Sequence, residues 1–248
     1  MSDRLVGNSF TSLPFKGCRV SSVLFLIRGH HSPEYLLDEK VQKETWAAPS
    51  ESQYDFIWVH SIKTQEIDIH SSSRIFVDCA DNFEDILEKT ILGLRVLLKT
   101  KTFEYCVLTN TSSYFNLPLL AKELNKMKKY YEDVGGFHQI NRWVELDGLV
   151  KGDTFVSGAG IFLSRSASLT LARLNPSEYV NIPDDIAVTH YLRKNGFKTF
   201  PKKRNTLYAH HVFIPRAHIR AKGNGNHELT RQRMKLIHKY FFSVTFGG

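Results

Sequence analysis

Blocks of apolar and polar positions along this chain predict an alternation of strands and helices. Residues 19–27 are short, apolar and β-branched, which is typical of a strand buried on both faces. Apolar residues recur at helical spacing over 83–98, which predicts an amphipathic helix capped by Asn82 or Asp81. Similar patterns predict strands at 55–60, 74–77, 103–108, 155–164 and 206–214, and helices at 33–46, 117–131, 167–174, 183–192 and 229–241.

The order of these elements indicates the fold class. Strands and helices alternate over residues 19–131 in a way that is typical of a mainly parallel sheet covered by helices. We therefore predict an α/β fold with a mixed, mostly parallel sheet flanked by helices, in a single domain spanning 1–248. Ligands bind beyond the carboxyl ends of such strands, so the turn at 109–113 and the loop after Ile27 are candidate sites. We expect Gly135-Gly136 to break the chain between elements.

Composition narrows the class of protein. The chain has 248 residues, of which 42% are hydrophobic and 23% charged, and this composition excludes a disordered protein. No apolar run approaches the ~20 residues of a membrane helix, and the first residues lack the apolar core of a signal peptide. Three scattered cysteines suit neither a disulfide framework nor a zinc site. We expect free thiols and a cytoplasmic location.

Positive charge is concentrated near the end of the sequence. The net charge is +8, and residues 193–239 hold thirteen lysines and arginines but a single acid, Glu228. Such a segment favours an anionic partner, which leaves open nucleic acid, an acidic membrane surface or a nucleotide diphosphate. A solvated surface is the structural alternative. Stacking aromatics are not regularly interleaved with the charges, so we do not favour nucleic acid.

Asp184-Asp185 opens the helix that follows Pro183. Acids in a first turn interact favourably with the helix dipole, and that structural role is sufficient to explain them. The functional alternative is that one carboxylate removes the proton of an acceptor hydroxyl, because a helix N-terminus after a loop holds it rigidly at a cleft.

A strip of basic residues follows at positions 216–222, in which every second side chain is basic and the side chains between them are apolar or small. Because side chains of an extended segment alternate between its faces, all four of its members are expected on one face, where they would cradle a diphosphate. The members of this strip are Arg216, His218, Arg220 and Lys222. His210-His211 and His218 could alternatively bind a metal. Walker, GxGxxG, nucleophile-elbow and HExxH motifs are absent from the sequence.

Five segments, in the same order, resemble the β-1,3-galactosyltransferase and Fringe superfamily. Residues 40–46 (KVQKETW) are similar to its R-x-x-x-R-x-T-W stretch, and residues 78–90 to D-F-x-D-S-Y-x-N-L-T-x-K-T. Residues 108–116 (LTNTSSYFN) fall where the superfamily has K-T-D-D-D-x-F-x-N. Residues 155–165 (FVSGAGIFLSR) resemble Y-x-S-G-G-G-Y-x-L-S-R, and residues 182–188 (IPDDIAV) resemble P-D-D-x-x-x-G. Small bacterial or viral sugar transferases fit the resemblance equally well.

The resemblance implies a GT-A (Rossmann-like) glycosyltransferase that uses a nucleotide-sugar donor and inverts the anomeric carbon. A donor-binding half would span about 20–130 and an acceptor-binding half 131–248. Asp185 matches the general base, with Asp184 orienting nearby groups. The floor of the cleft would be formed by Ser157, Gly158, Ala159 and Gly160, and the nucleotide would lie near Arg28, Asp81 and Lys89.

One departure concerns the metal. The superfamily's aspartate triad, which holds a divalent ion against the donor diphosphate, is replaced by Asn110, Thr111 and Ser112. Neutral side chains are poor ligands for a hard cation, so use of Mn²⁺ or Mg²⁺ is doubtful and the basic strip would balance the diphosphate instead. His211 lies near the position of a metal-binding histidine of the superfamily, which keeps a metal open.

We therefore expect a glycosyltransferase that moves a sugar to a hydroxyl of a glycan or glycolipid. The alternatives are a degenerate module that binds a sugar or nucleotide, and a basic nucleic-acid-binding protein. A glycolipid acceptor would bring the protein to an anionic inner membrane surface through Lys202, Lys203 and Arg204.

Overall fold

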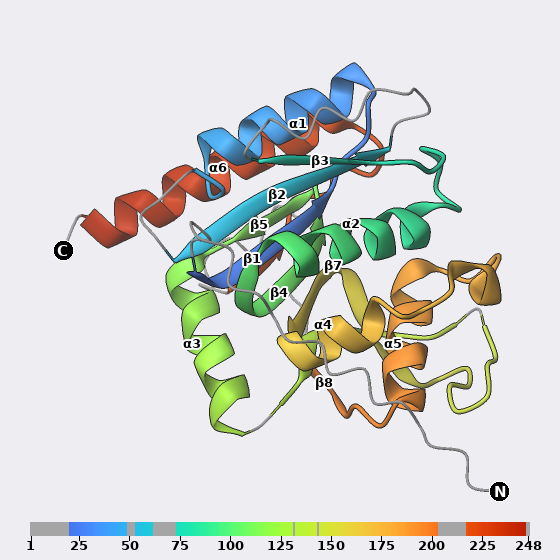
Figure 1. Cartoon of the computed structure of the whole chain (residues 1–248). Helices are drawn as coiled ribbons and strands as arrows, with labels where there is room; N and C mark the ends of the chain where they lie inside the picture. Colours follow the sequence, from blue (N-terminus) through green and yellow to red (C-terminus); the bar gives the residue numbers. More distant parts are fainter. Residues whose placement is uncertain are drawn as a thin grey trace, which may run out of the picture.

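The computed structural model describes residues 20–48, 53–61, 73–130, 132–142, 144–202 and 217–246. Within these ranges, seven strands form one mixed sheet between two layers of helices, and two further strands form a small ribbon (Figure 1). The strands are β1 (Val20–Arg28), β2 (Tyr54–Ser61), β3 (Arg74–Val77), β4 (Thr102–Asn110), β5 (Ser113–Phe115), β6 (Val134–Ile140), β7 (Thr154–Ser164), β8 (Thr199–Lys202) and β9 (His218–Arg220). The helices are α1 (Pro33–Glu44), α2 (Ile86–Thr100), α3 (Leu117–Lys129), α4 (Arg165–Leu171), the 3-10 turn η1 (Pro176–Tyr179), α5 (Asp184–Lys194) and α6 (His227–Phe246).

The sheet confirms the predicted α/β class and its mostly parallel character. Its strand order is β3-β2-β1-β4-β7-β6-β8. The four strands from β3 to β4 run parallel, β7 is antiparallel to both β4 and β6, and β6 is parallel to β8. The ribbon pairs β5 with β9 in antiparallel register, so Ser113 lies opposite Arg220.

Burial explains why the apolar residues of β1, an inner strand of the sheet, do not alternate with polar ones. Leu24, Phe25, Leu26 and Ile27 of β1 are all fully buried because helices cover both faces of the sheet. One core lies on the side of α2, α4 and α5. The other lies on the side of α1, α3, α6 and the ribbon, and its aromatic centre includes Trp58 and Phe115. This second layer brings the last described helix against the first, as Figure 1 shows for α6 and α1.

The glycine pair that we expected to break the chain lies inside β6 instead. Gly136 has a φ of 133°, and the register between β6 and β7 is irregular after it. A Cβ there would collide with the carbonyl oxygen of Gly160 on β7. The glycines therefore mark a close approach of two strands rather than a turn.

We expect Gly136→Ala to destabilise the protein by about 3 kcal/mol, because a strained φ and a backbone collision add together. Gly148 is the matched control: its φ is 79°, but no atom lies within 4 Å of the position that an added Cβ would take. Gly148→Ala should cost only about 1 kcal/mol. Urea denaturation of the two variants measures the difference, and equal losses would contradict the close-approach explanation.

Other elements differ from the predictions in their ends. α2 begins at Ile86, because Phe83 lies in the preceding turn with 71% of its surface exposed. α6 extends beyond its predicted range at both ends. β5 and β8 were not predicted, whereas β9 lies within the segment that was expected to be extended. The strand predicted at 206–214 lies outside the described residues.

Two of the three cysteines, Cys79 and Cys106, are buried free thiols, as expected, and Cys18 lies outside the described residues. None of the helices within the described ranges combines the length and the apolar character that crossing a lipid bilayer requires.

Candidate functional site

A cleft of about 1050 Å³ opens beyond the carboxyl ends of the parallel strands β1 and β4. Its walls come from both halves of the sequence, including the loops after β1, β3 and β4, the middle of β7, and the N-termini of α5 and α6. This is the edge of the sheet at which ligands bind in α/β proteins. Among the predicted site residues it is lined by Arg28, Asp81, Lys89, Asn110, Thr111, Ser112, Ser157, Gly158, Ala159, Asp184, Asp185, Arg220 and Lys222.

Arg28 joins four elements at the floor of this cleft. Its guanidinium forms an ion pair with Asp184 and donates to the carbonyl of Gly158, while Nε donates to the carbonyl of Thr109 over 3.1 Å. A Cβ at Gly158 would lie 3.0 Å from this guanidinium, so a side chain there would displace it. Arg28 therefore ties β1 and β4 to β7 and α5, in addition to lining the cleft.

Asp185 stands beside this ion pair at the first turn of α5. Its Oδ2 accepts from the backbone N–H of Gly158 over 3.1 Å, and its Oδ1 accepts from Ile186 over 3.0 Å. Burial and the neighbouring charge of Asp184 raise the pKa of Asp185 to about 6, against the opposing effects of those N–H groups and Arg28. Asp185 is thus a carboxyl group that can take up a proton near neutral pH.

The structure also brings Lys89 and Asp81 together. Lys89 is buried; its Nζ forms an ion pair with Asp81 and donates to the carbonyl of Gly29 over 3.0 Å. Asp81 accepts the backbone N–H of His31 over 3.0 Å. Burial acts to raise the pKa of Asp81, but these bonds and the charge of Lys89 outweigh it and hold the pKa below its usual range. The pair fixes the loop after β1 to the start of α2.

The turn formed by Asn110, Thr111 and Ser112 is internally bonded. The Oδ1 of Asn110 accepts from the backbone N–H of Ser112 over 3.2 Å and from its hydroxyl over 3.0 Å. Ser113 donates a third bond to the same oxygen over 3.1 Å. Within the described residues no group of three or more His, Cys, Asp or Glu could hold a metal ion. The donor set of this turn, which is neutral and whose amide oxygen is already bonded, does not fit a divalent cation.

The basic strip is only partly in the cleft. Arg220 donates from Nε to the hydroxyl of Ser112 over 3.0 Å and lines the cleft with the exposed Lys222. His218 is not among the lining residues: it is buried, and its ring lies 4.7 Å from both Phe115 and Phe137. Alternation along the sequence indicates which side chains of β9 share a face, but it does not indicate how deeply each one is buried. Only the Arg220 end of β9 borders the cleft. Gly160 is likewise deeper, near Phe115.

Two predicted residues, Arg216 and His211, lie outside the described part of the chain. The same holds for His210, Lys203 and Arg204. A metal on His211 and a membrane contact through the basic triplet therefore stay predictions.

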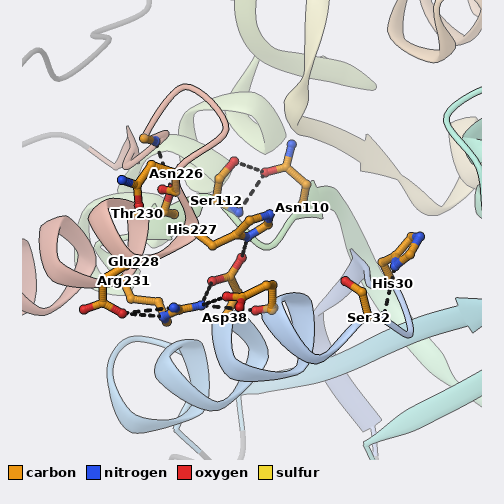
Figure 2. Close-up of polar contacts among 12 residues, drawn as sticks. His30, Ser32, Asp38, Asn110, Ser112, Asn226, His227, Glu228, Thr230 and Arg231 are labelled. Atoms are coloured by element: carbon orange, nitrogen blue, oxygen red, sulfur yellow. Dashed lines mark hydrogen bonds and ion pairs between the residues drawn. The ribbon is translucent and has the colours of Figure 1, made fainter.

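The sequence pattern gave no sign of a polar cluster between α1 and α6, which Figure 2 shows. The Nδ1 of His227 lies 2.6 Å from Oδ2 of Asp38, and Arg231 donates to Oδ1 of Asp38 over 3.2 Å. Asp38, His227 and the neighbouring Tyr35 all line the cleft. Burial raises the pKa of Asp38, and His227 and Arg231 act against that rise. Nothing in the sequence pattern pairs His227 with α1.

Comparisons with known proteins bear on the fold. No protein-family model matches the chain, and no curated protein matches it by sequence. Among solved structures, a glycosyltransferase involved in the glycosylation of the major capsid of PBCV-1 has 11% identity and a TM-score of 0.49, covering 87% of this chain and 99% of that chain. The mannosyltransferase PcManGT from Pyrobaculum calidifontis, in complex with GDP-Man and Mn²⁺, has 11% identity and a TM-score of 0.51. That match covers 92% of this chain but 66% of the mannosyltransferase. The chain therefore has an α/β fold of the kind found in that mannosyltransferase.

Proposed function

We propose that this protein is a glycosyltransferase that moves a sugar from a nucleotide-sugar donor to a hydroxyl group of a glycan or glycolipid. The observation that carries the proposal is the placement of Asp185, whose pKa is raised to about 6, in one cleft with the basic side chains of Arg220 and Lys222. A proton acceptor and a cationic wall are what transfer from a diphosphate donor to a hydroxyl requires.

The fold supports the same class of reaction. The mannosyltransferase that shares it is described in complex with GDP-Man and Mn²⁺, which is a nucleotide-sugar donor with a metal. In this chain the sequence resemblance to the Fringe superfamily supports inversion of the anomeric carbon. We propose a single displacement for that reason.

In this mechanism Asp185 takes the proton of the acceptor hydroxyl as its oxygen attacks the anomeric carbon. Asp184, held by Arg28, keeps the first turn of α5 in place. The leaving diphosphate would lie against Arg220 and Lys222, beside the turn of Asn110 to Ser112. We propose that these basic groups balance its charge, because the turn lacks carboxylates that would hold a cation there.

Nucleotide binding is the first test of this proposal. A ligand that binds only the folded state at 100 times its Kd adds about 2.7 kcal/mol of stability, and for a chain of this size that raises Tm by roughly 5–10 °C. We expect one family of nucleoside diphosphates and nucleotide sugars to give this shift, equally with Mn²⁺ and with EDTA. Thermal unfolding against a panel of uridine, guanosine, cytidine and adenosine diphosphates and their sugars measures it.

The outcomes separate the two parts of the proposal. A panel in which no nucleotide raises Tm would contradict the transferase. A shift that requires Mn²⁺ would retain the transferase and contradict the role given to Arg220 and Lys222.

A further inference from the structure

The buried carboxylate of Asp38 and the imidazole of His227 form a second polar pair that lines the cleft, on the side of the sheet covered by α1 and α6, whereas Asp185 lies on α5, which covers the other side. Asp38 has 2% of its surface exposed and lies on α1, while His227 is the first residue of α6. The 2.6 Å contact uses Nδ1 of His227, which leaves Nε2 for another partner. In Figure 2 the side chain of His227 extends toward Asp38 of α1, and His227 lines the same cleft as Asn110 and Ser112.

Several contacts hold the pair in position. Arg231, one turn further along α6, donates to the second oxygen of Asp38 over 3.2 Å and to Glu34 over 3.0 Å. The ring of Tyr35 stands edge-on to that of His227 with centroids 4.6 Å apart. Because both oxygens of Asp38 are bonded, the carboxylate cannot turn away, and the imidazole is held in one orientation.

The charged groups around His227 come from three segments. α1 contributes Asp38 and Glu34 with the hydroxyl of Tyr35, and α6 contributes Glu228 and Arg231, which pair with each other over 2.9 Å. The segment between β9 and α6 contributes Lys222. Asp38 is the group in direct contact, and because its carboxylate meets Nδ1, Nε2 is the ring nitrogen that is left to meet a ligand in the cleft.

We propose that His227 is a catalytic residue that donates its Nε2 proton to the leaving diphosphate, with Asp38 as the positioning residue. This inference rests on the proposed function. The bond from the acceptor oxygen to the anomeric carbon forms as the bond from that carbon to the phosphate oxygen breaks, and the electron pair stays on the phosphate oxygen. Asp185 receives the acceptor proton, and the Nε2 proton of His227 passes to the leaving oxygen. The products are the glycoside and a nucleoside diphosphate, and exchange with water restores both residues.

The placement of His227 explains how the leaving group is neutralised in a cleft whose turn does not fit a cation. A proton donor, Arg220 and Lys222 line the same cavity as the turn of Asn110 to Ser112. The anionic leaving group would meet these groups together with the N-terminal end of a 20-residue helix, where the helix dipole favours negative charge.

The test compares His227→Gln with His238→Gln. His238 lies on the same helix and its Nδ1 contacts the hydroxyl of Tyr114 over 3.1 Å, and it is not among the described residues that line the cleft. In EDTA at pH 6, we expect His227→Gln to weaken UDP or GDP binding by ~10-fold or more, as for loss of one bond to a charged group. Uridine or guanosine, which lack phosphates, should bind equally to all three proteins. The loss of turnover should be ~10²-fold with the donor identified by the nucleotide panel.

A second variant and a second readout separate chemistry from folding. Asp38→Asn should lower kcat with the identified donor while uridine or guanosine binding stays unchanged, because the imidazole loses the carboxylate that fixes its orientation. If a variant does not fold, nitrogen NMR of labelled histidines in the wild-type protein applies: UDP or GDP should shift the Nε2 resonance of His227, and the nucleoside should not.

The results distinguish this inference from the function on which it rests. If wild type binds and uses a nucleotide sugar while His227→Gln matches it in affinity, turnover and pH dependence, the role of His227 is overturned and the transferase stands. If wild type binds no nucleoside diphosphate, the proposed function itself is overturned, and the inference with it.

Discussion

Replacing Asp185 with asparagine is expected to lower sugar transfer by ~10²-fold or more while donor affinity stays close to wild type. The amide is nearly isosteric with the carboxylate but cannot take up the acceptor proton. In wild type, kcat/KM should fall below about pH 6, where burial and the charge of Asp184 place the pKa of Asp185. Steady-state release of nucleoside diphosphate across pH 5–9 measures both effects.

Stability gives this variant an internal check. The folded-state pKa of Asp185 lies above that of an aspartate in an unfolded chain, so its ionisation reduces stability as the pH rises from about 4 through about 6. Asp185→Asn should therefore melt at a higher temperature than wild type at pH 8 and lose that advantage at pH 4. Asp78→Asn, at an exposed carboxylate outside the residues that line the cleft, is the matched control and should keep wild-type turnover. Near-normal turnover in Asp185→Asn would rule out its role as the base.

Replacing Arg28 with methionine is expected to have the largest effect on stability, a loss of about 3–5 kcal/mol. The arginine side chain is 9% exposed and its partner Asp184 is 15% exposed, so removal leaves a largely buried carboxylate without its cation. The carbonyls of Thr109 and Gly158 also lose their donor. Because Arg28 lowers the pKa of Asp185, the acid limb of the activity profile should move to higher pH. Urea denaturation and the pH profile measure the two consequences.

Arg142→Met is the matched control for this substitution, because Arg142 is exposed and surface changes are usually within about 0.5 kcal/mol. The double variant Arg28→Met with Asp184→Leu should recover part of the lost stability, since an apolar pair can replace a buried ion pair. Equal stability of Arg28→Met and Arg142→Met would show that the ion pair contributes nothing.

The elements that could be predicted from the sequence are those whose pattern has a single physical cause. Residues 23–27 of β1 are all apolar because both faces of the strand are buried there, and α2 has one apolar face because it covers one side of the sheet. β6 could not be predicted, because glycines chosen for a close approach of strands have the same composition as glycines in a turn. The end of β4 was correctly expected to border the cleft, since parallel strands share an edge.

The polar pair lining the cleft that was not predicted joins residues far away from each other in the sequence. Asp38 and His227 are 189 positions apart, and neither has a local pattern that refers to the other. Period two assigned both Arg220 and His218 to the diphosphate; Arg220 lines the cleft and His218 is buried, because alternation reports the face of a strand and not how deep the residue lies. Long-range packing of α6 on α1 decides the first case, and the packing of His218 against Phe115 and Phe137 decides the second.

The packing of α6 on α1 also sets an order of events during synthesis. Protein chains emerge from the ribosome N-terminus first, and contacts between distant segments form only when the later segment is available. All strands of the large sheet leave the ribosome before α6, so the nascent chain can complete that sheet while one wall of the cleft is still missing. A nucleotide would meet the complete cleft only after α6 had emerged, so translation would separate the formation of the scaffold from the completion of the pocket.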